Sequence, residues 1–157
     1  MTIHVELDTN VLLCALLNPS KSSGKLVRAC ETRRAISLMS QPLWLEYQIV
    51  LERIAERTEK FSVENFQLML RKLRYLGDFS KDVRARFSFP RDPTDVKMIE
   101  LALHAGATHI ATYDPDLLSL PTSRTEAGKR FRQRLHSVRI PRPEDLLGEY
   151  SFLTSID

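Results

Sequence analysis

Residues 3–13 read IHVELDTNVLL, and this stretch contains the pattern that decides the fold. Residues 3–7 are rich in β-branched and apolar side chains and predict a strand, and the apolar run of residues 11–17 predicts a helix. Asp8 lies at the junction between the two. The stretch therefore predicts an acidic side chain at the carboxyl end of a first strand.

Similar acidic junctions recur twice further along the chain. Residues 91–95 read RDPTD and residues 112–116 read TYDPD, and each lies where a strand or loop gives way to a helix. Predicted strands and helices alternate, which indicates a parallel sheet covered by helices. In such a sheet the crevice lies beyond the carboxyl ends of the strands, so we expect these acids to meet in one cleft.

The segment boundaries follow from local signals. One helix is predicted to begin at Pro42, and a second follows an N-cap at Ser62. A third is predicted to begin at residue 93 and to end at Gly106. Gly77 ends the helix that Ser62 begins, and Asp114 is a predicted N-cap. The predicted strands cover residues 3–7, 35–40, 83–87, 109–112 and 138–140.

Length and composition suit one globular domain. The chain has 157 residues, of which 43% are hydrophobic and 27% charged, so we expect a single domain over residues 1–157. No apolar run approaches the roughly 20 residues that span a bilayer, and we expect a cytoplasmic protein without membrane contact. The two cysteines, Cys14 and Cys30, lie in apolar helical contexts and are interpreted as core residues.

Each acid has an ordinary structural explanation as well as a functional one. Aspartates at helix starts, such as Asp8 and Asp114, serve as caps in many proteins. Glu46 is more informative, because it lies at the margin of an apolar helix stripe where a carboxylate is costly unless it is paired or bound to a metal. Clustered carboxylates repel one another and need a cation to stay ionised. Their hard oxygen atoms favour Mg²⁺ or Mn²⁺, as one or two ions.

Other catalytic classes lack their motifs. The four histidines show no metal-ligand spacing, and none is paired with a serine or cysteine in a nucleophile motif. No glycine-rich phosphate loop follows the first strand. These observations argue against histidine catalysis and against nucleotide-binding enzymes.

Positive charge is concentrated near the carboxyl terminus. The formal net charge is only +3, but residues 124–142 contain seven lysines and arginines against one acid, Glu126. Such a segment favours an anionic partner such as nucleic acid. The alternative is a solvated helix face, and the acidic cluster favours the nucleic acid.

Taken in order, the motifs resemble the PIN domain. They are DTNVL at residues 8–12, the spacing of Leu43, Glu46 and Val50, the RDPTD motif with Ala102 and Gly106, and TYDPDLL at residues 112–118. The resemblance extends from residue 2 to about residue 147. Within the family, the motifs are most similar to those of the toxin components of bacterial and archaeal toxin–antitoxin pairs, the VapC-like ribonucleases.

The resemblance implies a three-layer α/β/α sandwich with a mainly parallel five-stranded sheet and metal-dependent cleavage of single-stranded RNA. It implies that Asp8, Glu46, Asp95 and Asp114 are the four catalytic and metal-binding acids, with Asp116 as a further metal ligand. It also implies a small cognate antitoxin, and we expect a homodimer.

Other residues are expected to assist. Asp95 fits the family spacing better than Asp92, because Ala102 follows it by seven residues. We expect Asn10, Asp92 and Thr112 to support the acidic site. The residues expected to bind RNA are Arg91, Lys129, Arg130, Arg132 and Arg134. The long basic segment of residues 121–136 departs from the short connection of the family and leaves the substrate contacts open.

Two alternatives remain at this point. A PIN-like protein could bind RNA or a protein partner without cleaving it, since a fold does not guarantee its chemistry. Retention of all four acids argues against this. An α/β regulatory or phosphotransfer domain with an acidic pocket is the second alternative, but it leaves Glu46 and the basic segment unexplained.

Overall fold

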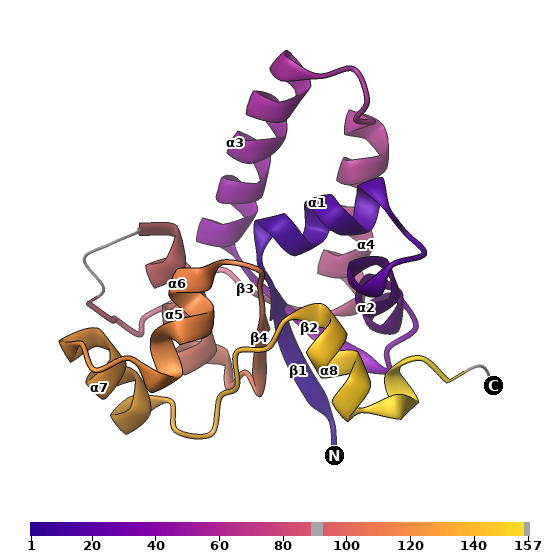
Figure 1. The fold of residues 1–157 in the computed structure, drawn as a ribbon. Coiled ribbons are helices and arrows are strands. Elements are labelled where there is room, and N and C mark those ends of the chain that lie inside the picture. The colour runs from indigo at the N-terminus through magenta and orange to yellow at the C-terminus, as the bar shows by residue number, and fades with distance from the viewer. Residues whose placement is uncertain (89–92, 156–157) are drawn as a thin grey trace.

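A parallel sheet flanked by helices organises the chain (Figure 1). The computed structural model describes residues 1–88 and 93–155. Within these residues the sheet has four strands in the order β3-β2-β1-β4, and all neighbouring strands are parallel. The strands are β1 (Ile3–Leu7), β2 (Ala35–Ser40), β3 (Asp78–Ser80) and β4 (His109–Ala111). The predicted α/β class is confirmed.

The helices connect the strands and cover the sheet. They are α1 (Thr9–Leu17), α2 (Ser22–Glu31), α3 (Gln41–Arg57), α4 (Val63–Leu76), α5 (Pro93–Ala105), α6 (Pro115–Ser119), α7 (Glu126–Arg134) and α8 (Pro143–Glu149). Two short 3₁₀ turns complete the set, η1 (Leu120–Thr122) and η2 (Ser151–Leu153). The long helix α3 and its neighbour α4 form a hairpin that extends beyond the sheet (Figure 1).

Capping residues set the helix boundaries, and the N-cap at Ser62 was predicted. The Ser40 hydroxyl accepts a hydrogen bond from the Leu43 N–H at the start of α3, and the Ser62 hydroxyl accepts one from the Asn65 N–H at the start of α4. These side chains satisfy N–H groups that the helix itself leaves without partners. Gly77 ends α4, and the chain enters β3 directly.

Strand β1 lies in the centre of the core. Ile3, Val5 and Leu7 are at most 3% exposed, and β1 pairs with β2 on one side and β4 on the other. Strands buried on both faces are typical of parallel sheets covered by helices. The central position of β1 fixes the place of Asp8, which follows it directly.

The prediction of five strands is wrong for the described residues. Residues 83–87 do not form a strand, because the chain pairs with β2 earlier, at Asp78–Ser80, as soon as α4 has ended. Residues 138–140 form only one parallel bridge, between His109 and Arg139. Pro141 follows at once, and a proline has no N–H with which to continue the ladder.

Candidate active site

The candidate acids lie at one edge of the sheet. In a parallel sheet each connecting helix returns against the strand direction, so helix N-termini gather at the carboxyl edge. Asp8 follows β1, and Asp114 is the N-cap residue of α6 after β4. Asp95 lies in the first turn of α5, and Glu46 is the sixth residue of α3. The topology thus brings the four acids to the same edge.

Hydrogen bonds orient the carboxylate of Asp8, which is only 7% exposed. Its Oδ1 atom accepts a hydrogen bond of 2.7 Å from the Thr9 N–H. Its Oδ2 atom accepts one of 2.6 Å from the Thr112 hydroxyl and a long one of 3.5 Å from the Asn10 side-chain amide. The buried Asp8 is therefore held in a defined orientation.

Thr112 connects Asp8 to the loop that bears Asp114. The Thr112 side chain is fully buried, and its hydroxyl oxygen accepts a hydrogen bond of 2.9 Å from the Asp114 N–H. The Asp114 Oδ1 atom in turn accepts one of 2.9 Å from the Asp116 N–H and so caps α6. Asn10 also contacts this loop, because its Oδ1 atom accepts a hydrogen bond from the Tyr113 N–H at 3.3 Å. The predicted supporting residues Thr112 and Asn10 therefore lie against Asp8.

An ion pair joins the other two acidic elements. The Lys97 Nζ atom on α5 lies 3.0 Å from Glu46 Oε2 on α3, and the side chains are 33% and 17% exposed, respectively. Asp95, two residues before Lys97, is 3% exposed. Lys97 was not among the residues predicted from the sequence. Its signal was a lone lysine in the otherwise apolar stretch of residues 96–99.

Tyr47 connects the two halves of the site. It follows Glu46 in α3, is 1% exposed, and donates a hydrogen bond of 2.7 Å from its hydroxyl to the Leu7 carbonyl, directly before Asp8. Burial raises the pKa of Tyr47 well above its usual value, and the charges of Asp8 and Glu6 raise it further. The phenol thus remains a donor that fixes α3 to the end of β1.

Glu6 is a second buried acid in β1. It is fully buried, and neither carboxyl oxygen has a hydrogen-bond partner among the described residues. Burial raises the pKa of Glu6 well above its usual value, and the charge of Asp8 adds to this effect. Glu6 and Asp8 share one face of the strand, because alternate residues point the same way. Glu6 was not predicted as a site residue, since a single glutamate in a strand forms no motif.

The donor set fits a hard cation, although the acids do not form a compact group. Within residues 1–88 and 93–155, no three or more Asp, Glu, His or Cys side chains lie close enough together to hold a metal ion. Mg²⁺ is commonly bound by one or two carboxylates and keeps several of its waters. The buried, oriented carboxylate of Asp8 suits such a site. Arg91 and Asp92 lie outside the described residues.

The predicted basic segment forms α7. Its Lys129, Arg130, Arg132 and Arg134 side chains are exposed. Arg132 bonds within the segment, because its Nη1 atom donates to the carbonyls of Ser123 at 2.6 Å and Pro121 at 3.3 Å. The four cations of α7 therefore have different surroundings, and Arg132 holds the turn that precedes the helix.

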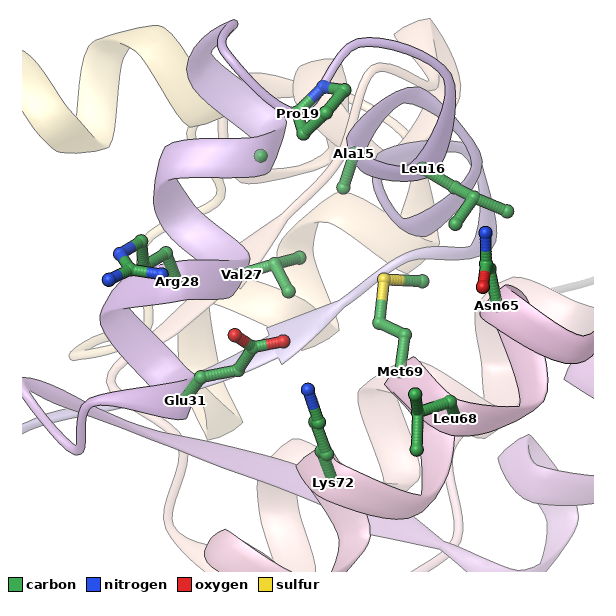
Figure 2. A pocket seen from close by; sticks show the side chains of 11 residues that line it. Ala15, Leu16, Pro19, Val27, Arg28, Glu31, Asn65, Leu68, Met69 and Lys72 are labelled. Atoms are coloured by element: carbon green, nitrogen blue, oxygen red, sulfur yellow. The ribbon is translucent and has the colours of Figure 1, made fainter.

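A separate pocket lies between α1, α2 and α4 (Figure 2). Glu31 of α2 and Lys72 of α4 point toward one another at one side of it, next to apolar side chains that include Val27 and Met69 (Figure 2). Its lining residues include none of the candidate acids. In the part of the chain that the structure describes, no helix has the length and apolar character needed to cross a membrane.

Comparisons with known proteins agree with this arrangement. A family model described as PIN domain matches residues 4–116, a range that includes Asp8, Glu46, Asp95 and Asp114. The chain is also 26% identical over 150 residues to the uncharacterized protein MJ1680 of Methanocaldococcus jannaschii, covering 94% of this chain and 92% of that protein. No solved structure gives a significant match. The family match covers more than half of the sequence, and the chain belongs to the PIN domain family.

Proposed function

We propose that this protein is a metal-dependent endoribonuclease that hydrolyses phosphodiester bonds of single-stranded RNA at the acidic edge of its sheet. PIN domains are generally nucleases, and family membership indicates this broader activity. The observation that carries the proposal is the hydrogen bonding of Thr112, which holds the Asp8 carboxylate and the Asp114 backbone together. A protein that needed only helix caps would not require this buried connection between two acidic junctions.

The proposed cofactor is Mg²⁺ or Mn²⁺, as one or two ions. Asp8 and Asp95 would hold the main ion, and Glu46, Asp114 and Asp116 would complete the site directly or through water. When bound, such an ion lowers the pKa of an attacking water and neutralises charge on the phosphoryl oxygens. The oxygen-only donor set supports Mg²⁺ or Mn²⁺ over zinc.

The protein side chains have distinct roles in this proposal. Thr112 and Asn10 orient Asp8, because their donors fix both the position and the rotation of its carboxylate. Lys97 holds Glu46 on the α5 side of the acidic edge. The ammonium group of Lys97 also offsets part of the repulsion among the acids in the absence of a metal. The acids are thus prepared for a cation before it binds.

The biological role that we propose is that of the toxin in a toxin–antitoxin pair. A toxin of this class would be cytoplasmic, would form a homodimer, and would be neutralised by a small cognate antitoxin. We expect the protein to arrest cell growth when it is expressed alone. Expression of a small partner encoded beside it should restore growth. Active enzyme without toxicity would instead favour a housekeeping nuclease.

A catalytically silent binding module is the second candidate. The Glu46–Lys97 pair favours it, because an acid that is already paired has less need of a metal. The test is incubation of purified protein with diverse single-stranded RNAs, with Mg²⁺, with Mn²⁺ and with chelator, followed by mapping of the cut ends. Metal-dependent internal cleavage supports the nuclease, and RNA binding without cleavage supports the silent module.

A further inference from the structure

A basic pocket lies where the segment of residues 82–88 passes beneath α7. Its volume is about 520 Å³. This size falls within the range of ordinary ligand pockets, roughly 300–1,000 Å³. The lining residues come from three separate parts of the chain: Arg86, Phe87 and Ser88 from the segment, Glu100 from α5, and Arg130 and Arg134 from α7.

Specific contacts build this pocket. The Arg134 Nη1 atom donates a hydrogen bond of 2.6 Å to the Arg86 carbonyl. The Arg134 guanidinium lies 6.0 Å from the centroid of the Phe87 ring, and the Phe87 N–H donates to Glu100 Oε2 at 3.0 Å. Phe87 is 6% exposed and forms part of the floor. These contacts fix α7 and the segment against α5, so the pocket is a defined feature of the fold.

The charge of the pocket favours an anion. Three arginines line it against one glutamate, whose carboxylate already accepts the Phe87 N–H. The hydrogen bonds found for Arg86 and Arg134 in the described part of the chain use only the Nη1 atom of each. A guanidinium carries five N–H donors in a planar fork, which suits the bidentate binding of phosphate. The pocket thus offers excess positive charge and donors of suitable geometry.

The pocket is connected to the acidic site through α5. Glu100 follows Lys97 by three residues, so the two lie on the same face of the helix about one turn apart. Lys97 contacts Glu46, one of the candidate acids. Along the axis of α5, Glu100 lies about 7.5 Å beyond Asp95, at 1.5 Å per residue. Glu100 therefore places the pocket on the face of α5 that bears Lys97.

We propose that this pocket, formed by Arg86, Arg130 and Arg134, binds a backbone phosphate of the single-stranded RNA substrate beside the position of cleavage. The inference rests on the proposed function and adds to it a specific substrate contact. It also separates the cations of α7 by role. Arg130 and Arg134 contact the RNA, and Arg132 supports the preceding turn through the carbonyls of Pro121 and Ser123.

The test is a binding titration with fluorescein-labelled uridine dodecamer, followed by fluorescence anisotropy at several NaCl concentrations without divalent metal. All proteins carry Asp8→Asn so that the RNA is not cut. The variants are Arg130→Ala, alone and combined with Arg134→Ala. The matched control is Arg124→Ala, which removes the same charge from an exposed position outside the pocket. Thermal melting checks that each variant is folded.

If the pocket binds phosphate, the slope of log K against log salt, which is negative, decreases in magnitude by about 0.7 for the single variant and by about 1.4 for the double variant. Arg124→Ala keeps the parent slope. Equal slopes in the pocket variants and the control would overturn the inference. The same variants are also titrated with an octaglutamate peptide, and loss of peptide binding with RNA binding unchanged would overturn it as well. Metal-dependent cleavage by the wild type would then still support the proposed function, whereas failure of the wild type both to bind and to cleave RNA would refute that function itself.

Discussion

Replacement of Thr112 by valine tests whether its hydroxyl holds the acidic site together. The side chain is fully buried, donates to Asp8 Oδ2 at 2.6 Å and accepts from the Asp114 N–H at 2.9 Å. Thr112→Val keeps the shape of the side chain and removes both hydrogen bonds. The Asp8 carboxylate then loses its closest donor, and the Asp114 N–H loses a buried acceptor.

The expected cost follows from these two bonds. A hydrogen bond to a charged group contributes about 1.5–3 kcal/mol to the free energy of unfolding, and a neutral one about 1 kcal/mol. The variant should therefore be less stable by about 2.5–4 kcal/mol. For a chain of this size each kcal/mol lowers the midpoint of thermal unfolding by about 2–4 °C, so we expect a decrease of about 5–16 °C. Metal-dependent RNA cleavage should fall at least about tenfold, the equivalent of 1.4 kcal/mol.

The control is Thr112→Ser, which keeps the hydroxyl and removes one methyl group, at a cost of about 0.8 kcal/mol. Thermal melting at neutral pH and initial rates of RNA cleavage are measured for both variants and the wild type. The reasoning requires that the serine variant stay close to wild type and that the valine variant lie well below it. A valine variant as stable and as active as the serine variant would refute the role of the hydroxyl.

Three further predictions concern charged and titratable groups. Lys97→Met removes the ammonium that pairs with Glu46. An ion pair of this kind is worth up to about 1 kcal/mol, so Mn²⁺ affinity measured by calorimetry should rise by up to about fivefold. Glu6→Met removes a fully buried carboxyl whose oxygens lack partners among the described residues and should stabilise the fold by about 1–3 kcal/mol in chemical denaturation. Burial, and then the charge of Arg139, lowers the pKa of His109. As the pH is lowered, His109 is therefore protonated in the unfolded chain before it is protonated in the folded protein. The midpoint of thermal unfolding should then decline as the pH falls below about 6.5, and this decline should be smaller in His109→Gln.

Each of these predictions has a contrary outcome. Unchanged Mn²⁺ affinity in Lys97→Met would mean that the ammonium does not compete with the cation. A less stable Glu6→Met protein would mean that the acid makes a stabilising contact. Parallel pH profiles for wild type and His109→Gln would show that His109 does not control stability in this range.

The strongest local signals in the sequence predicted the fold correctly. Residues 35–40 form a strand, Ser62 caps a helix, and Gly77 ends it, as expected from capping chemistry. The error at residues 83–87 has a physical reason. Their alternating apolar and basic side chains match a half-buried strand, but the chain there packs under α7, where the Phe87 N–H finds the Glu100 side chain as its acceptor. Periodicity alone does not distinguish these two partners.

The candidate site was only partly visible in the sequence. The aspartates and Thr112 could be selected because they lie at junctions that precede helices and match the family motifs, and Glu46 because it lies at the margin of an apolar helix stripe. Lys97, Tyr47 and Glu6 could not, because their roles depend on which helix face meets which strand. Arg86 joins the basic pocket from a segment far from α7 in the sequence, and only the tertiary structure brings the two together.

The most direct test of the central claim is a cleavage assay with purified wild-type protein and its Asp8→Asn and Asp95→Asn variants. A labelled single-stranded RNA is incubated with Mg²⁺, with Mn²⁺ or with excess chelator, and the products are separated by length. We predict internal cuts by the wild type only when a metal is present, and no cuts by either folded variant. Cleavage at the wild-type rate by either variant, or equal cleavage in chelator, would contradict a nuclease that works through a metal held at these acids.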